Sequence, residues 1–507
     1  MDIPFLTLLL VVPLIGAIIT LFMGNDRAKY AKYTAIIFAL ITLVLATYML
    51  FIDSSKLSNL DENYVWIEFG ILKMNYALHI DGLSILMVFL TALLVLVVVI
   101  FSWEEKDRPN YYHTLLLAME VGLMGVYLSA DYFLFYIMWE VTLIPMFFMI
   151  SWYGGPRRHY SAIKFFIYTH VASLVMLIGI FAMVFDASTV SGVADFSFAA
   201  VKAGLAVDAD ALTQTFLFGF LFFGFIVKMP VVPFHTWLPD AHVEAPTAGS
   251  VLLAGVMLKM GSYGIIRVCI ENFTEALVFW KWVMIILGIV SMIYGAYACI
   301  AQKDLKKMVA YSSISHMGMV LLAIGCSIEG GIGGYSAAGI EFAIFQMFAH
   351  GLITAVLFMV CGLAGHNIGT RDIPLLGGMA SKMPLWAFFM MFGFMASLGL
   401  PGLVGFVAEF GILYSFWEVI ANTEFMWMIV FGMLSMMLTA GYYLWSMQRT
   451  LFGDLTDKID LEHVHDISKS ELIAMAIMVY MIAVFGILPS LATDFITTYT
   501  PFIGGLI

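Results

Sequence analysis

The sequence has 507 residues, of which 62% are hydrophobic and only 11% are charged, whereas soluble proteins carry about 25% charged residues. This composition is typical of an integral membrane protein, and the net charge of −12 offers no basic surface to a nucleic acid. The four cysteines lie far apart in apolar segments. No Cys/His spacing or glycine-rich phosphate loop indicates a metal or nucleotide site.

A helix needs about 20 mostly apolar residues to cross a bilayer, and the sequence contains fourteen segments of this kind. The first segment has no basic leader and no small-residue cleavage site, so we expect a retained helix and not a signal peptide. The sequence therefore predicts an all-α integral membrane protein with about 14 transmembrane helices. Their centres lie near residues 13, 42, 92, 121, 141, 173, 223, 257, 288, 314, 350, 399, 436 and 482.

The basic residues of the loops predict an orientation. Sixteen of the 23 Lys and Arg residues lie in the connections on one side, five lie on the other side, and two lie within spans. Because basic residues in short loops favour the cytoplasm, we expect both termini on the outer side. The longest polar connections are 53–82, 186–211 and 452–470, and the last is predicted to be cytoplasmic.

Ionisable residues inside membrane spans are rare and mark candidate functional sites. Each also has a structural alternative: a neutral carboxyl bonded to backbone, a lysine that reaches the membrane surface, or a histidine that fills a gap in the bundle. The candidates are Glu120, Glu140, His170, Lys228, Lys259, His316, His350 and Glu409.

Glu140 lies in the middle of an apolar span, where a carboxylate needs a cationic partner. Lys228 is the best candidate for that partner, because it ends an apolar run and is followed by Pro230 and Pro233. Prolines cannot donate backbone hydrogen bonds and interrupt a helix, and interrupted helices commonly form mid-membrane ion sites. The alternative is that Lys228 reaches the cytoplasmic surface.

The remaining candidates continue this series. Lys259 lies about fourteen residues into its span, roughly 21 Å along a helix that rises about 1.5 Å per residue, which is too deep for easy contact with water. His316 and His350 can both accept and donate protons. The "GLPG" at 399–402 predicts a second helix break shortly before Glu409. Such a row of acids, bases and histidines can shift protons when an ion pair opens.

The two predicted breaks fall in the seventh and twelfth spans, the offset expected if spans 4–8 and 9–13 are two inverted five-helix repeats. The predicted division places helices 1–3 in residues 1–110, the first repeat in 111–272, the second in 273–450, and a cytoplasmic loop with the last helix in 451–507. No pattern indicates a redox centre in this chain, so a partner or an ion gradient must supply the energy.

Four stretches carry a resemblance to a known family over about residues 70 to 450. They are "YIMWEVTLIPMFFMISWYGG", "KMPVVPFHTWLPDAHVEAPTAGSVLLAGVMLKMGSYGIIR", "DLKKMVAYSSISHMG" and "GLPGLVGFVAEF". They resemble the antiporter-like subunits of respiratory complex I, the proton-translocating NADH:quinone oxidoreductase. The chain length, and Glu409 where L- and N-type subunits have a lysine, are similar to the M-type (chain 4) group.

The resemblance implies a proton-translocating subunit of the membrane arm. It implies that Glu140 pairs with Lys228, that Lys259 is the central proton carrier, and that His316 and His350 carry the proton onward. NADH oxidation and quinone reduction would take place in other subunits, so this chain would hold no cofactor. FMN, iron–sulfur clusters, NADH and quinone would all be bound by its partners.

The resemblance also assigns the residues at the edges of the series. Glu409 would serve the outward half-channel, Glu120 would contribute to a neighbouring channel, and His170 has no implied role, so we expect it to be structural. The chain would lie in a bacterial inner membrane, between L-type and N-type neighbours, with both termini on the periplasmic side.

Three other functions use the same features. A subunit of a multi-subunit cation/proton antiporter has no redox partner, and Glu409 in place of a lysine argues against it. A membrane subunit of an energy-converting hydrogenase shares the fold. A scaffold subunit would pump nothing, and Glu140→Gln would then leave proton translocation intact.

Overall fold

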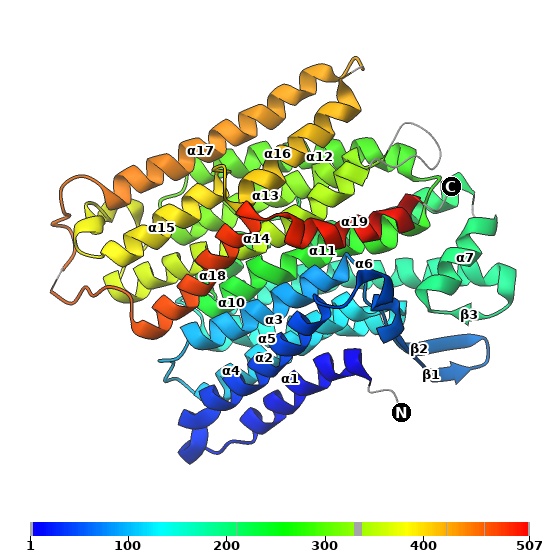
Figure 1. Cartoon of the computed structure of the whole chain (residues 1–507), viewed down its shortest axis with the longest axis horizontal. Helices are drawn as coiled ribbons and strands as arrows, with labels where there is room; N and C mark the ends of the chain where they lie inside the picture. Colours follow the sequence, from blue (N-terminus) through cyan, green and yellow to red (C-terminus); the bar gives the residue numbers. More distant parts are fainter. Residues whose placement is uncertain (1–3, 209, 329–336, 422, 461, 505–507) are drawn as a thin grey trace.

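The structure is a computed structural model that describes residues 4–208, 210–328, 337–421, 423–460 and 462–504. Figure 1 shows helices packed side by side, with both chain ends and a small β-hairpin at the same end of the bundle. We call this the terminal end, and the other the distal end. The helical membrane fold predicted from the apolar segments is confirmed.

The helices divide into two long series along the chain. The first comprises α1 (Phe5–Leu21), α2 (Ala31–Met49), α3 (Ser84–Phe101), α4 (Pro109–Leu128), α5 (Tyr132–Tyr153), α6 (Arg158–Ser191), α7 (Phe198–Asp208), α8 (Ala211–Lys228), α9 (Trp237–Glu244), α10 (Thr247–Leu252) and α11 (Leu258–Gly264). The second comprises α12 (Leu277–Ile300), α13 (Leu305–Cys326), α14 (Ala337–Leu363), α15 (Pro384–Ser397), α16 (Val404–Ile420), α17 (Ile429–Leu451), α18 (Lys469–Ile487) and α19 (Ser490–Gly504). Short 3-10 turns occupy Asn25–Tyr30, Ser54–Leu60, Ile373–Leu375, Met379–Ser381 and Met426–Met428.

Within the described residues, eleven helices are long and apolar enough to cross a membrane. Every predicted span centre falls inside a helix, except the one near residue 399, which lies between α15 and α16. The count of fourteen stays a prediction, because α1 and α15 are apolar but shorter than a full span, and α4 is not among the eleven.

A small sheet and two short helices at the terminal end lie outside the predicted spans. The polar connection 53–82 contains an antiparallel hairpin of β1 (Glu62–Phe69) and β2 (Leu72–Leu78), and β3 (Ala194–Asp195) pairs with β2 in parallel. The helices are α7 and α19, and the sequence analysis predicted neither them nor the sheet. α7 is an apolar helix, but with 11 and 15 residues α7 and α19 are shorter than the apolar run of about 20 residues that predicts a span.

Both predicted helix breaks are present. α8 ends at Lys228 and α9 begins at Trp237, while α15 ends at Ser397 and α16 begins at Val404. In the second break Gly399 and Gly402 have φ angles of +79° and +92°, which only glycine adopts without a Cβ clash. Each break therefore places irregular backbone beside a candidate residue, Lys228 at the first and Glu409 at the second.

The span that carries Lys259 is continuous but irregular. Its short helices α10 and α11 alternate with two π-helical segments, Leu253–Met257 and Ile265–Ile270. π-helical turns are rare and often occur at functional sites, because the wider turn displaces the backbone hydrogen bonds. The segment around Lys259 is thus flanked on both sides by a shift in helical register.

We expect Gly405→Ala to destabilise the second break. A Cβ at Gly405 would lie 2.0 Å from the carbonyl oxygen of Ala396, so α15 and α16 would have to separate at a cost of about 1–3 kcal/mol. Thermal unfolding of the purified protein in detergent measures this. Gly441→Ala in α17 is the control, because nothing lies within 4 Å of a Cβ there. Equal shifts in both variants would contradict the steric argument.

Candidate functional site

Four of the predicted residues meet in the interior of the bundle. Lys259 donates to the carbonyl oxygen of Ala254 in its own span, and its Nζ lies 2.7 Å from Nδ1 of His350 in α14. The His350 ring lies 5.5 Å from the ring of His316 in α13, centroid to centroid. Nδ1 of His316 is 3.4 Å from Oε1 of Glu409 in α16. The row Lys259–His350–His316–Glu409 thus draws one residue from each of four helices.

The row is closed to solvent. Lys259 is fully buried, and the other three residues are each 2% exposed. Next to the helix break, Oγ of Ser397 lies 3.2 Å from Nε2 of His316 and 2.8 Å from the hydroxyl of Tyr443. Ser397 and Tyr443 thus supply hydrogen-bonding groups beside His316 in a part of the bundle that is closed to solvent.

The break between α15 and α16 makes room for the Glu409 carboxyl. A Cβ at position 399 would lie 2.9 Å from Oε2 of Glu409. Gly399 therefore has two functions: it adopts the positive φ angle of the turn, and its missing side chain leaves space for the carboxyl group of Glu409. The "GLPG" signal and Glu409 belong to one local arrangement.

Glu140 has partners that the sequence analysis did not predict. Its Oε2 lies 2.9 Å from Nδ1 of His170 in α6, and its Oε1 accepts a short hydrogen bond from Ser173. The ring of His170 also stacks on Phe166. The ion pair between Glu140 and Lys228 that the resemblance implies is not formed, because α6 supplies nearer partners. His170, expected to be structural, instead contacts a candidate site residue.

Lys228 is buried and lies among aromatic rings. Its Nζ is 5.7 Å from the ring centroid of Trp139 and 5.6 Å from that of Phe165, distances at which a cation attracts the face of a ring. It has no hydrogen-bond partner among the described residues, but it interacts electrostatically with Glu140. With 1% of its surface exposed, it does not reach the membrane surface, so that alternative is wrong.

Glu120 stands apart from the other candidates. It is fully buried in α4, and neither carboxyl oxygen has a hydrogen-bond partner among the described residues. Buried polar groups without partners are rare in native structures. The structure does not bring Glu120 into contact with the row.

Two buried residues on the distal side were missed. His242 in α9 stacks on Phe358 with ring centroids 4.3 Å apart and interacts electrostatically with Lys259 and Lys306. Lys306 donates to the carbonyl oxygen of Ala245 at 2.6 Å. The sequence analysis placed Lys306 in a loop and passed over the "DAHVEAP" segment, although a histidine after a helix break was a usable signal.

Lys306 lines a cavity of about 610 Å³ at the distal end. Glu244, His366 and Arg371 line the same cavity, and so does Thr247 at the start of the span that carries Lys259. Polar and charged side chains therefore line a cavity next to the buried Lys306.

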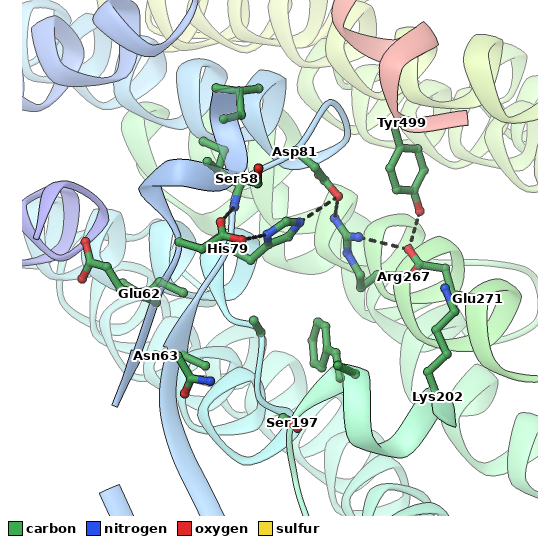
Figure 2. Close-up of a pocket in the computed structure, with 18 of the residues that line it drawn as sticks. Ser58, Glu62, Asn63, His79, Asp81, Ser197, Lys202, Arg267, Glu271 and Tyr499 are labelled. Carbon is green, nitrogen blue, oxygen red and sulfur yellow. Dashed lines mark hydrogen bonds and ion pairs between the residues drawn. The ribbon is translucent and has the colours of Figure 1, made fainter. Parts of the chain in front are cut away.

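A second polar cluster lies at the terminal end, around a cavity of about 710 Å³ (Figure 2). Nη2 of Arg267 is 2.6 Å from Oδ2 of Asp81, and Nη1 is 3.1 Å from Oε1 of Glu271. Glu271 also accepts a hydrogen bond from the hydroxyl of Tyr499 in α19. His79 lies between Asp81 and Asp61, at 3.6 Å and 2.8 Å. None of these residues was singled out from the sequence.

Charge pairing perturbs the groups of this cluster that lie outside the spans. Burial alone lowers the pKa of His79, but hydrogen bonds to Asp61 and Asp81 outweigh it and raise the pKa to about 9. Burial raises the pKa of Asp81, but the nearby Arg267 and His79 hold it well below its usual range. His79 therefore carries a positive charge at neutral pH.

We expect this histidine to contribute pH-dependent stability. A folded pKa of about 9 against an ordinary 6.5 means that protonated His79 stabilises the fold below the lower value and that this is lost as pH rises through the higher one. His79→Gln should lower stability by about 1 kcal/mol near pH 6, since the pair is partly exposed to solvent. Near pH 10 variant and parent should unfold alike. A pH-independent difference in unfolding temperature would contradict this.

Within the described residues, no group of three or more His, Cys, Asp or Glu side chains is placed to hold a metal ion. The chemistry of the interior row is that of proton acceptors and donors. A bundle of membrane-crossing helices with two broken helices and a buried row of ionisable side chains defines a membrane transport subunit.

Comparison with known proteins gives the family. A sequence model described as "NADH:quinone oxidoreductase/Mrp antiporter, TM" matches residues 129–439. The match covers more than half of the chain, and the chain belongs to this family. The broken helices and the row Lys259–His350–His316–Glu409 all lie within the matched region.

Relatives match over nearly the whole chain. F(420)H(2) dehydrogenase subunit M of Methanosarcina mazei is 40% identical over 97% of this chain and 96% of the relative. NADH-quinone oxidoreductase subunit M of Rhodobacter capsulatus is 38% identical over 93% of this chain and 90% of the relative. The resemblance to M-type antiporter-like subunits is confirmed.

Solved structures share the fold. A chain of respiratory complex I from Thermus thermophilus superposes with a TM-score of 0.85 and 26% identity, covering 99% of this chain and 98% of that one. A chain of the Mrp complex from Dietzia sp. DQ12-45-1b superposes with a TM-score of 0.83 at 19% identity, which supports the fold alone.

Proposed function

We propose that this chain is a proton-translocating membrane-arm subunit of a respiratory oxidoreductase of the NADH:quinone type, with all electron transfer in partner subunits. The single observation that carries the proposal is the buried row Lys259–His350–His316–Glu409, in which each side chain lies close to the next. A scaffold subunit would have no need for four buried ionisable groups, each of which is costly in a membrane.

The row moves a proton by successive transfers. The Lys259 ammonium gives a proton to Nδ1 of His350 and becomes a neutral amine. His350 passes a proton from Nε2 to His316, whose ring centroid lies 5.5 Å away. His316 gives a proton from Nδ1 to the carboxylate oxygen Oε1 of Glu409. Each histidine is left as its other tautomer and must reset before the next transfer, and Lys259 regains its proton from the uptake side. Glu409, beside the break between α15 and α16, releases the proton to the outer side.

Uptake takes place on the distal side, which the positive-inside rule assigns to the cytoplasm. The cavity beside Lys306 admits water and protons. His242 senses the positive charges of both Lys306 and Lys259, and neither of its ring nitrogens has a hydrogen-bond partner among the described residues. Glu140 and Lys228 form the control pair. A proton or charge change at Glu140 alters the field at Lys228, and through it at Lys259.

The proposal includes the repeat organisation and the surroundings of the chain. Residues 111–272 and 273–450 form two inverted five-helix repeats, whose broken helices carry Lys228 and Glu409. The chain lies in a bacterial inner membrane, with both termini on the periplasmic side.

A neighbouring membrane-arm subunit covers the side of the bundle that carries Glu140. The Glu140 and His170 side chains are 22% and 36% exposed in the isolated chain. Leaving such a pair against lipid would be costly, which supports a protein neighbour at this face. By the family resemblance, L-type and N-type subunits flank the chain.

The electron donor belongs to the partners. Relatives are named both for NADH and for F(420)H(2), so either donor fits the same membrane subunit. An antiporter without a redox partner is the second candidate, and the relatives' names favour the redox complex. Assays should therefore offer both donors to the intact complex.

We expect Glu140→Gln to abolish coupled activity. In inverted membrane vesicles given NADH or reduced F(420), acceptor reduction and interior acidification should both fall to the level of membranes that lack the complex, because the charge that controls Lys228 is lost. Assembly is checked on a native gel. Glu418→Gln is the control, since Glu418 is exposed and, among the described residues, its recorded hydrogen bond is from Tyr414. Wild-type pumping by an assembled Glu140→Gln complex would refute the proposal.

We expect His170→Gln to weaken the same activity without abolishing it. A hydrogen bond to a charged group contributes about 1.5–3 kcal/mol, so the rates should fall by about tenfold and the pH profile should change. His159→Gln is a matched control on the same helix, where the ring nitrogen contacts only Ser151. If both variants match the parent, His170 only packs against Glu140.

A further inference from the structure

A polar stripe runs from Lys259 to the cavity at the terminal end. Tyr263 and Arg267 follow Lys259 at intervals of four residues, which places them along one side of the span. Nε of Arg267 lies 3.3 Å from the hydroxyl of Tyr263. Beyond Arg267 come Asp81 and the cavity of about 710 Å³. Lys259 therefore has two polar directions, one toward His350 and one toward this cavity.

A route from Lys259 to the terminal-end cavity would let protons leak without following the proposed pathway. The cavity is partly open, since the side chains of His79 and Asp61 on its wall are 36% and 37% exposed. A proton that passed from Lys259 to this cavity would bypass His350, His316 and Glu409. Something must therefore close the stripe between Lys259 and Asp81.

Arg267 has the chemistry to close it. A guanidinium stays protonated at any physiological pH and has no lone pair with which to accept another proton. A fixed positive charge in a narrow polar passage also repels an excess proton. A lysine or histidine at this point would relay protons, whereas an arginine cannot.

The surroundings hold the guanidinium in place. Its side chain is only 7% exposed and is bound on two sides, by Asp81 and by Glu271 (Figure 2). On the Lys259 side, the Tyr263 hydroxyl donates to the carbonyl oxygen of Tyr127, and the two rings pack edge to face at 5.1 Å. These contacts leave the guanidinium few alternative positions.

We propose that Arg267 is a proton barrier that closes the route from Lys259 to the terminal-end cavity. A proton that reaches Lys259 is thereby directed through His350, His316 and Glu409. The inference rests on the proposed role of Lys259 as a proton carrier. It assigns to Arg267 a role in coupling, distinct from its ties to α3 and α19.

The test measures leak separately from pumping. Inverted vesicles carrying the intact complex with Arg267→Gln are given a pH gradient without any electron donor, and its decay is recorded. We expect decay about threefold faster or more than in the parent, since the fixed charge is gone. With a donor present, the number of protons pumped per acceptor reduced should fall. Arg267→Lys keeps a positive charge but can release and accept a proton, so it should also leak faster than the parent.

Three further variants separate a barrier from a structural tie. Lys202→Gln alters the same cavity wall without touching the cluster and should not leak. Tyr499→Phe removes the hydrogen bond to Glu271 and should not leak either. In vesicles with Arg267→Gln combined with Lys259→Met, the pH gradient should decay as slowly as in the parent, because the leak route starts at Lys259. If that double variant leaks like Arg267→Gln, or if Tyr499→Phe leaks equally, the barrier proposal is wrong.

Failure of assembly has its own control. Arg267→Gln leaves Asp81 as a buried charge without its main partner, which is strongly destabilising. Arg267→Gln with Asp81→Asn removes both charges and leaves no buried carboxylate without a partner, and its leak is then measured. If the pH gradient in vesicles with this double variant decays as slowly as in the parent, the proposal that Arg267 is a proton barrier is wrong. Collapse of pumping in Glu140→Gln would still support the proton-pump function, so the two proposals fail by different measurements.

Discussion

The contact between Lys259 and His350 is the interaction on which the rest of the structure depends. The Nζ atom of Lys259 and the imidazole of His350 meet at 2.7 Å in a buried part of the bundle, where desolvation of a charge costs several kcal/mol. The cost is offset by local features of the span itself. The π-helical segments on either side of Lys259 change the helical register, and the carbonyl oxygen of Ala254 accepts from Nζ.

The proton outlet and the control pair of the proposed mechanism differ in exposure. Glu409 is buried and closed off beside a helix break, whereas Glu140 and His170 are partly exposed on the side of the bundle. The outlet is therefore internal to the chain, and the control pair is accessible to a neighbour. This asymmetry suits a subunit that receives a signal from the side and moves a proton across the membrane.

The span that carries Lys259 also joins two cavities with different cations. Thr247 at its start lines the cavity with Lys306, and Arg267 near its end lines the cavity with Asp81. A lysine can gain and lose a proton when its surroundings change, but an arginine cannot. Placing lysine on the uptake side and arginine on the other allows one span to be open to protons at one end only.

The sequence by itself determined the membrane class, the position of the spans, both helix breaks and the set of ionisable candidates. These are local signals: an apolar run of sufficient length, a proline or glycine at a fixed position, and a charge within hydrocarbon. Only the tertiary structure decided which candidates meet. His170 bonds to Glu140 across 30 residues, His350 to Lys259 across 91, and Asp81 to Arg267 across 186.

The physical reason is that a partner in a helix bundle depends on which helix faces pack together. A membrane span is apolar on all sides, so its periodicity does not mark the face that turns inward. For this reason the sequence did not show that Glu140 bonds directly to His170 and interacts with Lys228 only electrostatically among the described residues. His242, Lys306 and Arg267 were missed for the same reason. Their roles arise from helices brought together in space, while the charges and the breaks were readable from the chain alone.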